Sequence, residues 1–162
     1  MNTNAIKTFA IEARQNLMQA VKAKIYHWGF DEKGNILEEP AATYGGYTFR
    51  GEVYMDETVL PKWEKLKNRI KSGEKLEDIA EEAAYTWFNR LMAIKILEKN
   101  GYISPVLEFS EGTRTPLIVQ NAKRGMHDLT DENDKNQLAD YLQNDQEALA
   151  FNLLITRYCN HY

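Results

Sequence analysis

Several features that define common protein classes are missing from this sequence. The single cysteine, Cys159, excludes an internal disulfide and suits a reducing compartment, so we expect a cytoplasmic protein. No run of eighteen apolar residues occurs, which excludes a membrane-spanning helix of ordinary length. The N-terminus interrupts its apolar pattern with charges and has no small-residue cleavage site, so it is not a secretory signal.

The sequence also lacks a net positive charge and has few prolines. The net charge of −4 does not indicate a dedicated small DNA-binding domain, although a piece of a larger enzyme need not be basic. The chain has four prolines, no two of them adjacent, and no Pro/Gly/Ser-rich linker. We therefore expect one domain over residues 1–162, a length sufficient for a hydrophobic core.

Helical periodicity is the strongest positive signal. It is clearest from Leu76 to Leu97, where apolar residues recur at steps of three and four and two stripes run side by side, the second including Ile96. Asn100-Gly101 is a typical helix stop. A helix that is apolar over more than half its circumference is enclosed by neighbours, so we expect this one to be central to a mainly α, bundle-like domain.

Five further helices are predicted from caps, stops and apolar spacing. We place them at residues 6–28 with Thr3 or Asn4 as the cap, 61–72 with Thr58 as the cap, 116–124 with Thr115 as the cap, 132–142 opened by Thr130 and Asp131, and 146–162 with Asp145 as the cap. Between the first two, residues 47–50 and 52–54 are expected to pair as a small β-ribbon around Gly51, and residues 106–109 form an extended segment.

The last predicted helix has apolar residues around nearly its whole circumference and no terminal cap before Tyr162. Such a helix indicates that the natural polypeptide continues and covers it. A core helix that happens to be terminal is the alternative.

Candidate chemistry is limited. Gly45-Gly46 does not precede a helix, so it is not a phosphate-binding loop. Cys159 and His161 could supply two metal ligands, but zinc needs three or four, so we expect no metal site. No combination of nucleophile, base and orienting group is recognisable, and we assign no catalytic residue.

One cluster of charge is a candidate binding site. The second predicted helix and its exit carry six basic side chains, a pattern that suits contact with the phosphates of double-stranded DNA. A solvated helix face without a ligand is the alternative reading. The candidate DNA-binding residues are Lys62, Lys65, Lys67, Arg69, Lys71 and Lys75.

Three blocks of the sequence resemble a known family. NTNAIKTFAIEARQNLMQAV, EEAAYTWFNRLMAIKILEKNGYI and EALAFNLLITRYCNHY, in this order, are similar to the N-terminal helical region of the adenine-specific DNA methyltransferases of bacterial BREX phage-exclusion systems, and to related restriction-modification methyltransferases. The AYTWFNRLMAIKILEKNGY block is the most specific of the matches. The three blocks together span nearly the whole chain.

The resemblance implies a parent enzyme that transfers a methyl group from S-adenosylmethionine to N6 of adenine. The family's Asn-Pro-Pro-Tyr or Asp-Pro-Pro-Tyr catalytic motif does not occur here, so no catalytic residue and no cofactor site is transferred to this chain. The implied partners are the chain's own downstream methyltransferase domain, double-stranded DNA and other defence-system proteins. A protein-interaction module that never contacts DNA, and a complete small helical protein of unrelated function, remain the alternatives.

Overall fold

The computed structural model describes residues 3–110 and 112–161, without the side chains of Thr3, Ala5, Ile6 and His161. The predicted cap at Thr3, the stripe position Ile6, the candidate ligand His161 and the chain end at Tyr162 therefore lie outside what is described. Within the described residues, no helix is both long enough and apolar enough to cross a membrane.

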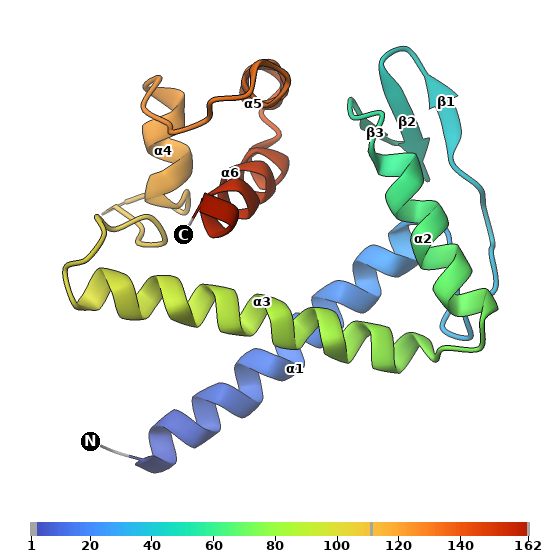
Figure 1. Cartoon of the computed structure of the whole chain (residues 1–162), viewed down its shortest axis with the longest axis horizontal. Helices are drawn as coiled ribbons and strands as arrows, with labels where there is room; N and C mark the ends of the chain where they lie inside the picture. Colours follow the sequence, from blue (N-terminus) through green and yellow to red (C-terminus); the bar gives the residue numbers. More distant parts are fainter. Residues whose placement is uncertain (1–2, 111, 162) are drawn as a thin grey trace. The chain divides into compact units, whose positions relative to one another are not determined.

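The described part of the chain is mainly α-helical with one small antiparallel sheet, which confirms the predicted fold class (Figure 1). All six predicted helices are present, and their bounds lie within three residues of those expected. The elements are α1 (Thr3–His27), β1 (Ala41–Thr43), β2 (Gly46–Phe49), β3 (Glu52–Tyr54), α2 (Val59–Lys71), α3 (Leu76–Lys99), α4 (Leu117–Lys123), α5 (Glu132–Gln143) and α6 (Glu147–His161).

The chain divides into two compact units, Met1–Asn89 and Arg90–Tyr162. In the first unit the three strands follow one another in the order β1-β2-β3. The predicted ribbon is confirmed as the β2–β3 pair, in which Phe49 lies opposite Glu52. Its turn, Arg50-Gly51, has φ of 46° and 87°, and positive φ at both central residues is typical of a tight hairpin turn.

The core of the first unit is aromatic. Trp28 stacks on Phe49 with ring centroids 5.7 Å apart, and Phe49 meets Tyr54 edge to face at 5.4 Å. Phe30 packs against Trp63 of α2 at 5.6 Å. These contacts attach both the sheet and α2 to the end of α1, and so they fix which side of α2 is buried.

In the second unit, α4, α5 and α6 carry the core. Asp131, one of the residues predicted to open this helix, caps α5, because its carboxylate accepts hydrogen bonds from the backbone N–H groups of Asn133 and Asp134. On α6, Ala150 and Ile155 are fully buried. The core residues of this unit are Ile94, Ile118, Val119, Ala122, Leu138, Tyr141, Ala150, Leu154 and Ile155.

Several local predictions were wrong. Pro116, not Thr115, occupies the cap position of α4, and the Thr115 hydroxyl donates a hydrogen bond to Glu147. Asp145 adopts a left-handed conformation, with φ of 54°, two residues before α6 begins. The segment at 106–109, expected to be an extended piece of a loop, begins with bends at 106 and 107, and Phe109 forms an isolated bridge with Pro116.

The apolar stripes of α3 were also overestimated. Ile79, Ala80, Ala84 and Ile94 are buried as predicted. Ile96, which belongs to the second stripe, is 55% exposed. Helical periodicity places a residue on a face of the helix, but whether a neighbour covers that face depends on the rest of the fold.

Candidate functional site

The predicted basic residues lie on α2 and its exit, where the buried side of the helix decides how they point. Trp63 is almost completely buried and defines that side. With about 3.6 residues per turn, positions three or four apart share a face, so the basic residues of the helix divide into two groups that flank the buried stripe. The groups are Lys62, Lys65 and Arg69 on one flank, and Lys67 and Lys71 on the other.

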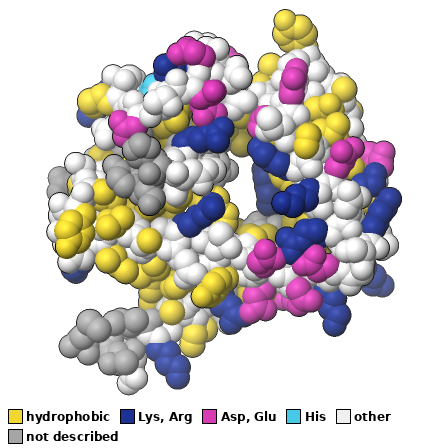
Figure 2. All heavy atoms as spheres, viewed as in Figure 1, with side chains coloured by type: hydrophobic (Ala, Val, Ile, Leu, Met, Phe, Trp, Pro, Cys, Tyr) yellow, Lys and Arg dark blue, Asp and Glu magenta, His cyan; other side chains and the backbone are white. Residues whose placement is uncertain are grey.

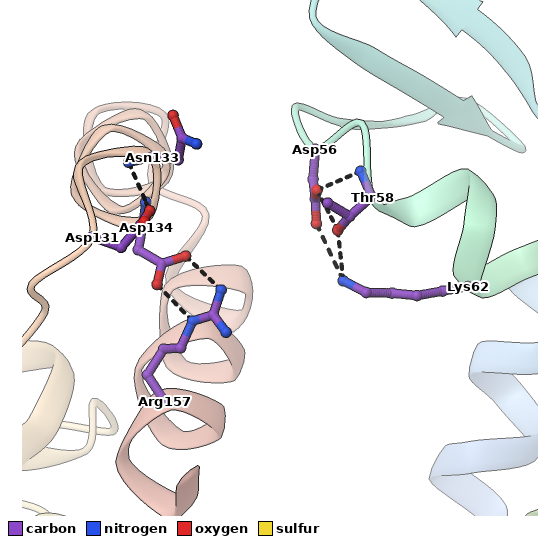
Figure 3. A network of polar contacts seen from close by, with 7 residues as sticks. All are labelled: Asp56, Thr58, Lys62, Asp131, Asn133, Asp134 and Arg157. Carbon is purple, nitrogen blue, oxygen red and sulfur yellow. Dashed lines mark hydrogen bonds and ion pairs between the residues drawn. The ribbon is translucent and has the colours of Figure 1, made fainter. Parts of the chain in front are cut away.

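Lys62 is held by the segment that leads into α2 (Figure 3). Its amine donates a hydrogen bond to the Thr58 hydroxyl at 2.9 Å and lies 3.5 Å from the Asp56 carboxylate. Burial works to raise the pKa of Asp56, but hydrogen bonds from Thr58 and the nearby Lys62 charge outweigh it, and the pKa is lowered. Thr58 occupies the cap position without a side-chain capping bond, because its hydroxyl donates to Asp56 instead.

Lys67 is also occupied. Its amine lies 3.2 Å from a carboxylate oxygen of Glu39 and 4.8 Å from the centroid of the Trp63 ring. Its stem covers part of the indole, so the residue contributes to packing as well as to charge.

Arg69 has the strongest internal partners of the six. Its guanidinium donates to both oxygens of Glu74, with the Nε bond at 2.8 Å, and also to Glu82 of α3. These hydrogen bonds raise the pKa of Arg69 and lower that of Glu74. Two carboxylates around one guanidinium leave no net positive charge at this position.

The remaining three basic residues are different. Lys65, Lys71 and Lys75 are exposed, and within residues 3–110 and 112–161 none of them forms an ion pair. Figure 2 shows that paired and unpaired basic groups share one surface, because dark blue side chains over α2 are interspersed with magenta acidic ones. The six residues therefore provide three uncompensated charges and three neutralised ones.

Other candidate chemistry is sparse in the described residues. No three His, Cys, Asp or Glu side chains among them are grouped closely enough to hold a metal ion. Cys159 is half-buried, and this burial raises the pKa of its thiol, with Arg90 acting in the opposite direction. A raised thiol pKa disfavours the nucleophilic thiolate.

By its fold and its candidate site, the chain is a mainly α-helical protein with one basic helix at its surface. It is 35% identical over 122 residues to the adenine-specific methyltransferase BrxX of Escherichia coli O9:H4 (strain HS), covering 74% of this chain and 10% of that protein. It is 32% identical over 134 residues to the adenine-specific methyltransferase PglX of Lacticaseibacillus casei (strain Zhang), covering 75% of this chain and 11% of that protein.

These matches confirm the family resemblance: the chain is a relative of the BREX adenine-specific methyltransferases. It spans about a tenth of the length of these two proteins. No family model and no solved structure matches the chain.

Proposed function

We propose that this chain is the N-terminal helical domain of an adenine-specific DNA methyltransferase of a BREX phage-defence system. In this role it helps to hold duplex DNA and packs against the downstream methyltransferase domain. That domain binds S-adenosylmethionine and transfers its methyl group to adenine N6, while the chain itself contributes no catalytic group. The proposal includes action in the cytoplasm, where the DNA substrate lies.

Support for the DNA-binding part comes from the uncompensated lysines of α2 and its exit. A lysine amine with no carboxylate partner can approach a phosphate without first breaking an ion pair. Each phosphate that is neutralised releases condensed counterions, which drives binding in a salt-dependent way. We therefore narrow the predicted site from six residues to three, Lys65, Lys71 and Lys75.

The test is a charge reversal of these three lysines with a matched control. Fluorescence anisotropy measures binding of a labelled DNA duplex across a salt series. The variant K65E/K71E/K75E should bind more weakly, and its slope of log affinity against log salt should be shallower by about 0.9 for every phosphate that the variant no longer neutralises.

The control variant K7E/K33E/K99E makes the same change in net charge at three other exposed lysines. If both triple variants lose affinity equally, only the overall charge matters and the site on α2 is refuted. Unchanged affinity in K65E/K71E/K75E would reject DNA binding by this helix altogether.

A protein-interaction module is the second candidate, and exposed apolar side chains favour it. Phe9 and Ile11 on α1 are 54% and 50% exposed, and Tyr44 in the β1–β2 turn is 94% exposed. Contiguous patches of exposed apolar groups are typical of surfaces that dock other proteins, and this candidate function requires these side chains to belong to such a patch. A pull-down with the other proteins of the defence system distinguishes the two candidates: capture that is lost in F9S/I11S, together with no duplex binding, would favour the interaction module.

A further inference from the structure

The second unit contains a pocket of about 310 Å³ that the proposed DNA contacts do not use. It lies between the end of α4, the segment that leads from α4 to α5, and the last turns of α6. This volume is at the small end of the range of about 300–1,000 Å³ that ligand pockets have, so it suits a small molecule or a single side group rather than a chain.

The pocket has an apolar lining with a few polar groups. Val106, Ile118, Leu129 and Leu154 supply aliphatic surface, which suits the flat apolar face of an unsaturated ring. Asn121 and Asn160 also line the pocket. A primary amide presents a donor and an acceptor side by side, which matches the edge of a nucleobase.

His127 adds an unsatisfied polar group to this lining. Its Nδ1 is buried and has no hydrogen-bond partner in the described part of the chain. Buried polar atoms are rarely left without a partner, because the lost hydration is not replaced. A ligand that hydrogen-bonds to this imidazole would therefore offset the free-energy cost of burying Nδ1 without a partner.

The charges of the lining argue against an anionic ligand. Asp134 is almost fully buried, and Arg157 pairs with it through two bonds, from Nε at 2.6 Å and from Nη2 at 2.7 Å (Figure 3). This pair neutralises the cation of the pocket, and Asp128 leaves one negative charge in excess. A phosphate group would be repelled here, whereas an uncharged heterocycle would not.

We propose that this pocket binds a nucleobase as an uncharged ring, held by His127 and the two asparagine amides between aliphatic walls. The base comes either from a free nucleoside or from an unpaired position in a nucleic-acid strand. The inference is independent of the lysines on α2, since it depends only on residues of the second unit.

The experiment is an NMR titration of the isotopically labelled chain with adenosine. We expect saturable shifts of backbone amides within residues 118–130 and 154–160. The variant H127F keeps an aromatic ring but has no ring nitrogen, and should weaken binding about tenfold through the lost hydrogen bond. AMP should bind more weakly than adenosine because its phosphate meets the excess negative charge.

A pair of asparagine variants on α6 provides the matched control. N160A removes a group that lines the pocket and should weaken adenosine binding, whereas N152A removes an exposed amide that does not line it and should leave binding unchanged. The thermal unfolding of both variants confirms that they fold. The absence of saturable shifts, equal affinities of N160A and wild type, or tighter binding of AMP than of adenosine would overturn the proposal.

Competition distinguishes the two sources of the base. A single-stranded oligomer of deoxyadenosine that displaces adenosine, when an abasic oligomer of the same length does not, identifies a base within a strand. Failure of both oligomers to displace bound adenosine identifies the free nucleoside.

Discussion

The indole Nε1 of Trp63 donates a hydrogen bond to the backbone carbonyl of Trp28, 2.9 Å away. This bond joins the buried side of α2 to the residue that follows α1. Trp28 itself has a buried Nε1 without a partner among the described residues. The two tryptophans therefore lie in the same core with opposite hydrogen-bonding states, since the indole N–H of Trp63 has a partner and that of Trp28 has none among the described residues.

Replacing each tryptophan by phenylalanine should have unequal effects on stability. Trp63→Phe leaves the Trp28 carbonyl without its donor, and should lower the free energy of unfolding by about 1–3 kcal/mol. Trp28→Phe weakens the ring packing against Phe49, which lowers the free energy of unfolding. Part of this loss is offset, because the variant also removes a buried donor that has no partner among the described residues. Urea unfolding of both variants measures the difference, and a larger loss of stability for Trp28→Phe would contradict this account.

Two glycines with similar backbone angles provide a second prediction. Gly29 and Gly73 have φ of 89° and 95°, a region that costs other residues about 1 kcal/mol or more. A Cβ at Gly29 would lie 2.1 Å from the carbonyl oxygen of Glu38, whereas one at Gly73 meets nothing within 4 Å. Gly29→Ala must therefore displace the backbone as well.

The melting temperature of the two alanine variants checks this difference. Gly73→Ala should show only the strain of the left-handed conformation, and Gly29→Ala should be clearly less stable. Equal melting temperatures would mean that the chain near Glu38 moves away without cost.

Glycine stops of this kind explain why the helices could be predicted from the sequence. Gly73 and Gly101 end α2 and α3 through local backbone geometry, which needs no information from distant residues. Strand β1 was missed, because Ala41–Thr43 has no alternation of apolar and polar residues and all three are exposed. It becomes a strand only through pairing with β2.

The six basic residues of the candidate site were predicted from the sequence, but the ion pairs that neutralise three of them were not. The sequence gives no sign of the pairing between Arg69 and Glu82, because Glu82 is thirteen positions away and reaches Arg69 only where α3 folds back in the first unit. Glu39 is twenty-eight positions from Lys67. The pocket of the second unit had no sequence signal at all, because its lining comes from separate helices and a connecting segment.

The pH dependence of stability should report on Glu98. Its side chain is only 4% exposed, which alone would raise its pKa. Hydrogen bonds from the backbone N–H groups of Leu107 and Val106 and from the Lys95 amine outweigh burial, and the pKa is lowered. A carboxyl with a lowered folded-state pKa stabilises the fold above its ordinary value of 4.5, and this stability is lost as the pH falls through the folded-state pKa.

Unfolding by urea at a series of acidic pH values tests this prediction. Wild type should lose stability as the pH falls below 4.5, and Glu98→Gln should be less stable at neutral pH and lose less on acidification. Glu12→Gln changes an exposed carboxyl and is the control. Parallel pH curves for Glu98→Gln and wild type would contradict the role of Glu98.

Neutralising the carboxylates around Arg69 should strengthen DNA binding, whereas reversing the charge of the lysines should weaken it. If α2 contacts DNA phosphates, Glu74 and Glu82 restrain a cation that would otherwise take part. The variant E74Q/E82Q should therefore bind duplex DNA more tightly than wild type, with a steeper salt dependence, because one more cation becomes available for a phosphate. E12Q/E32Q makes the same change in net charge at two exposed glutamates and should produce a smaller gain. Equal gains in both variants would show that net charge alone controls binding, and no gain in either would show that α2 does not lie at the phosphates.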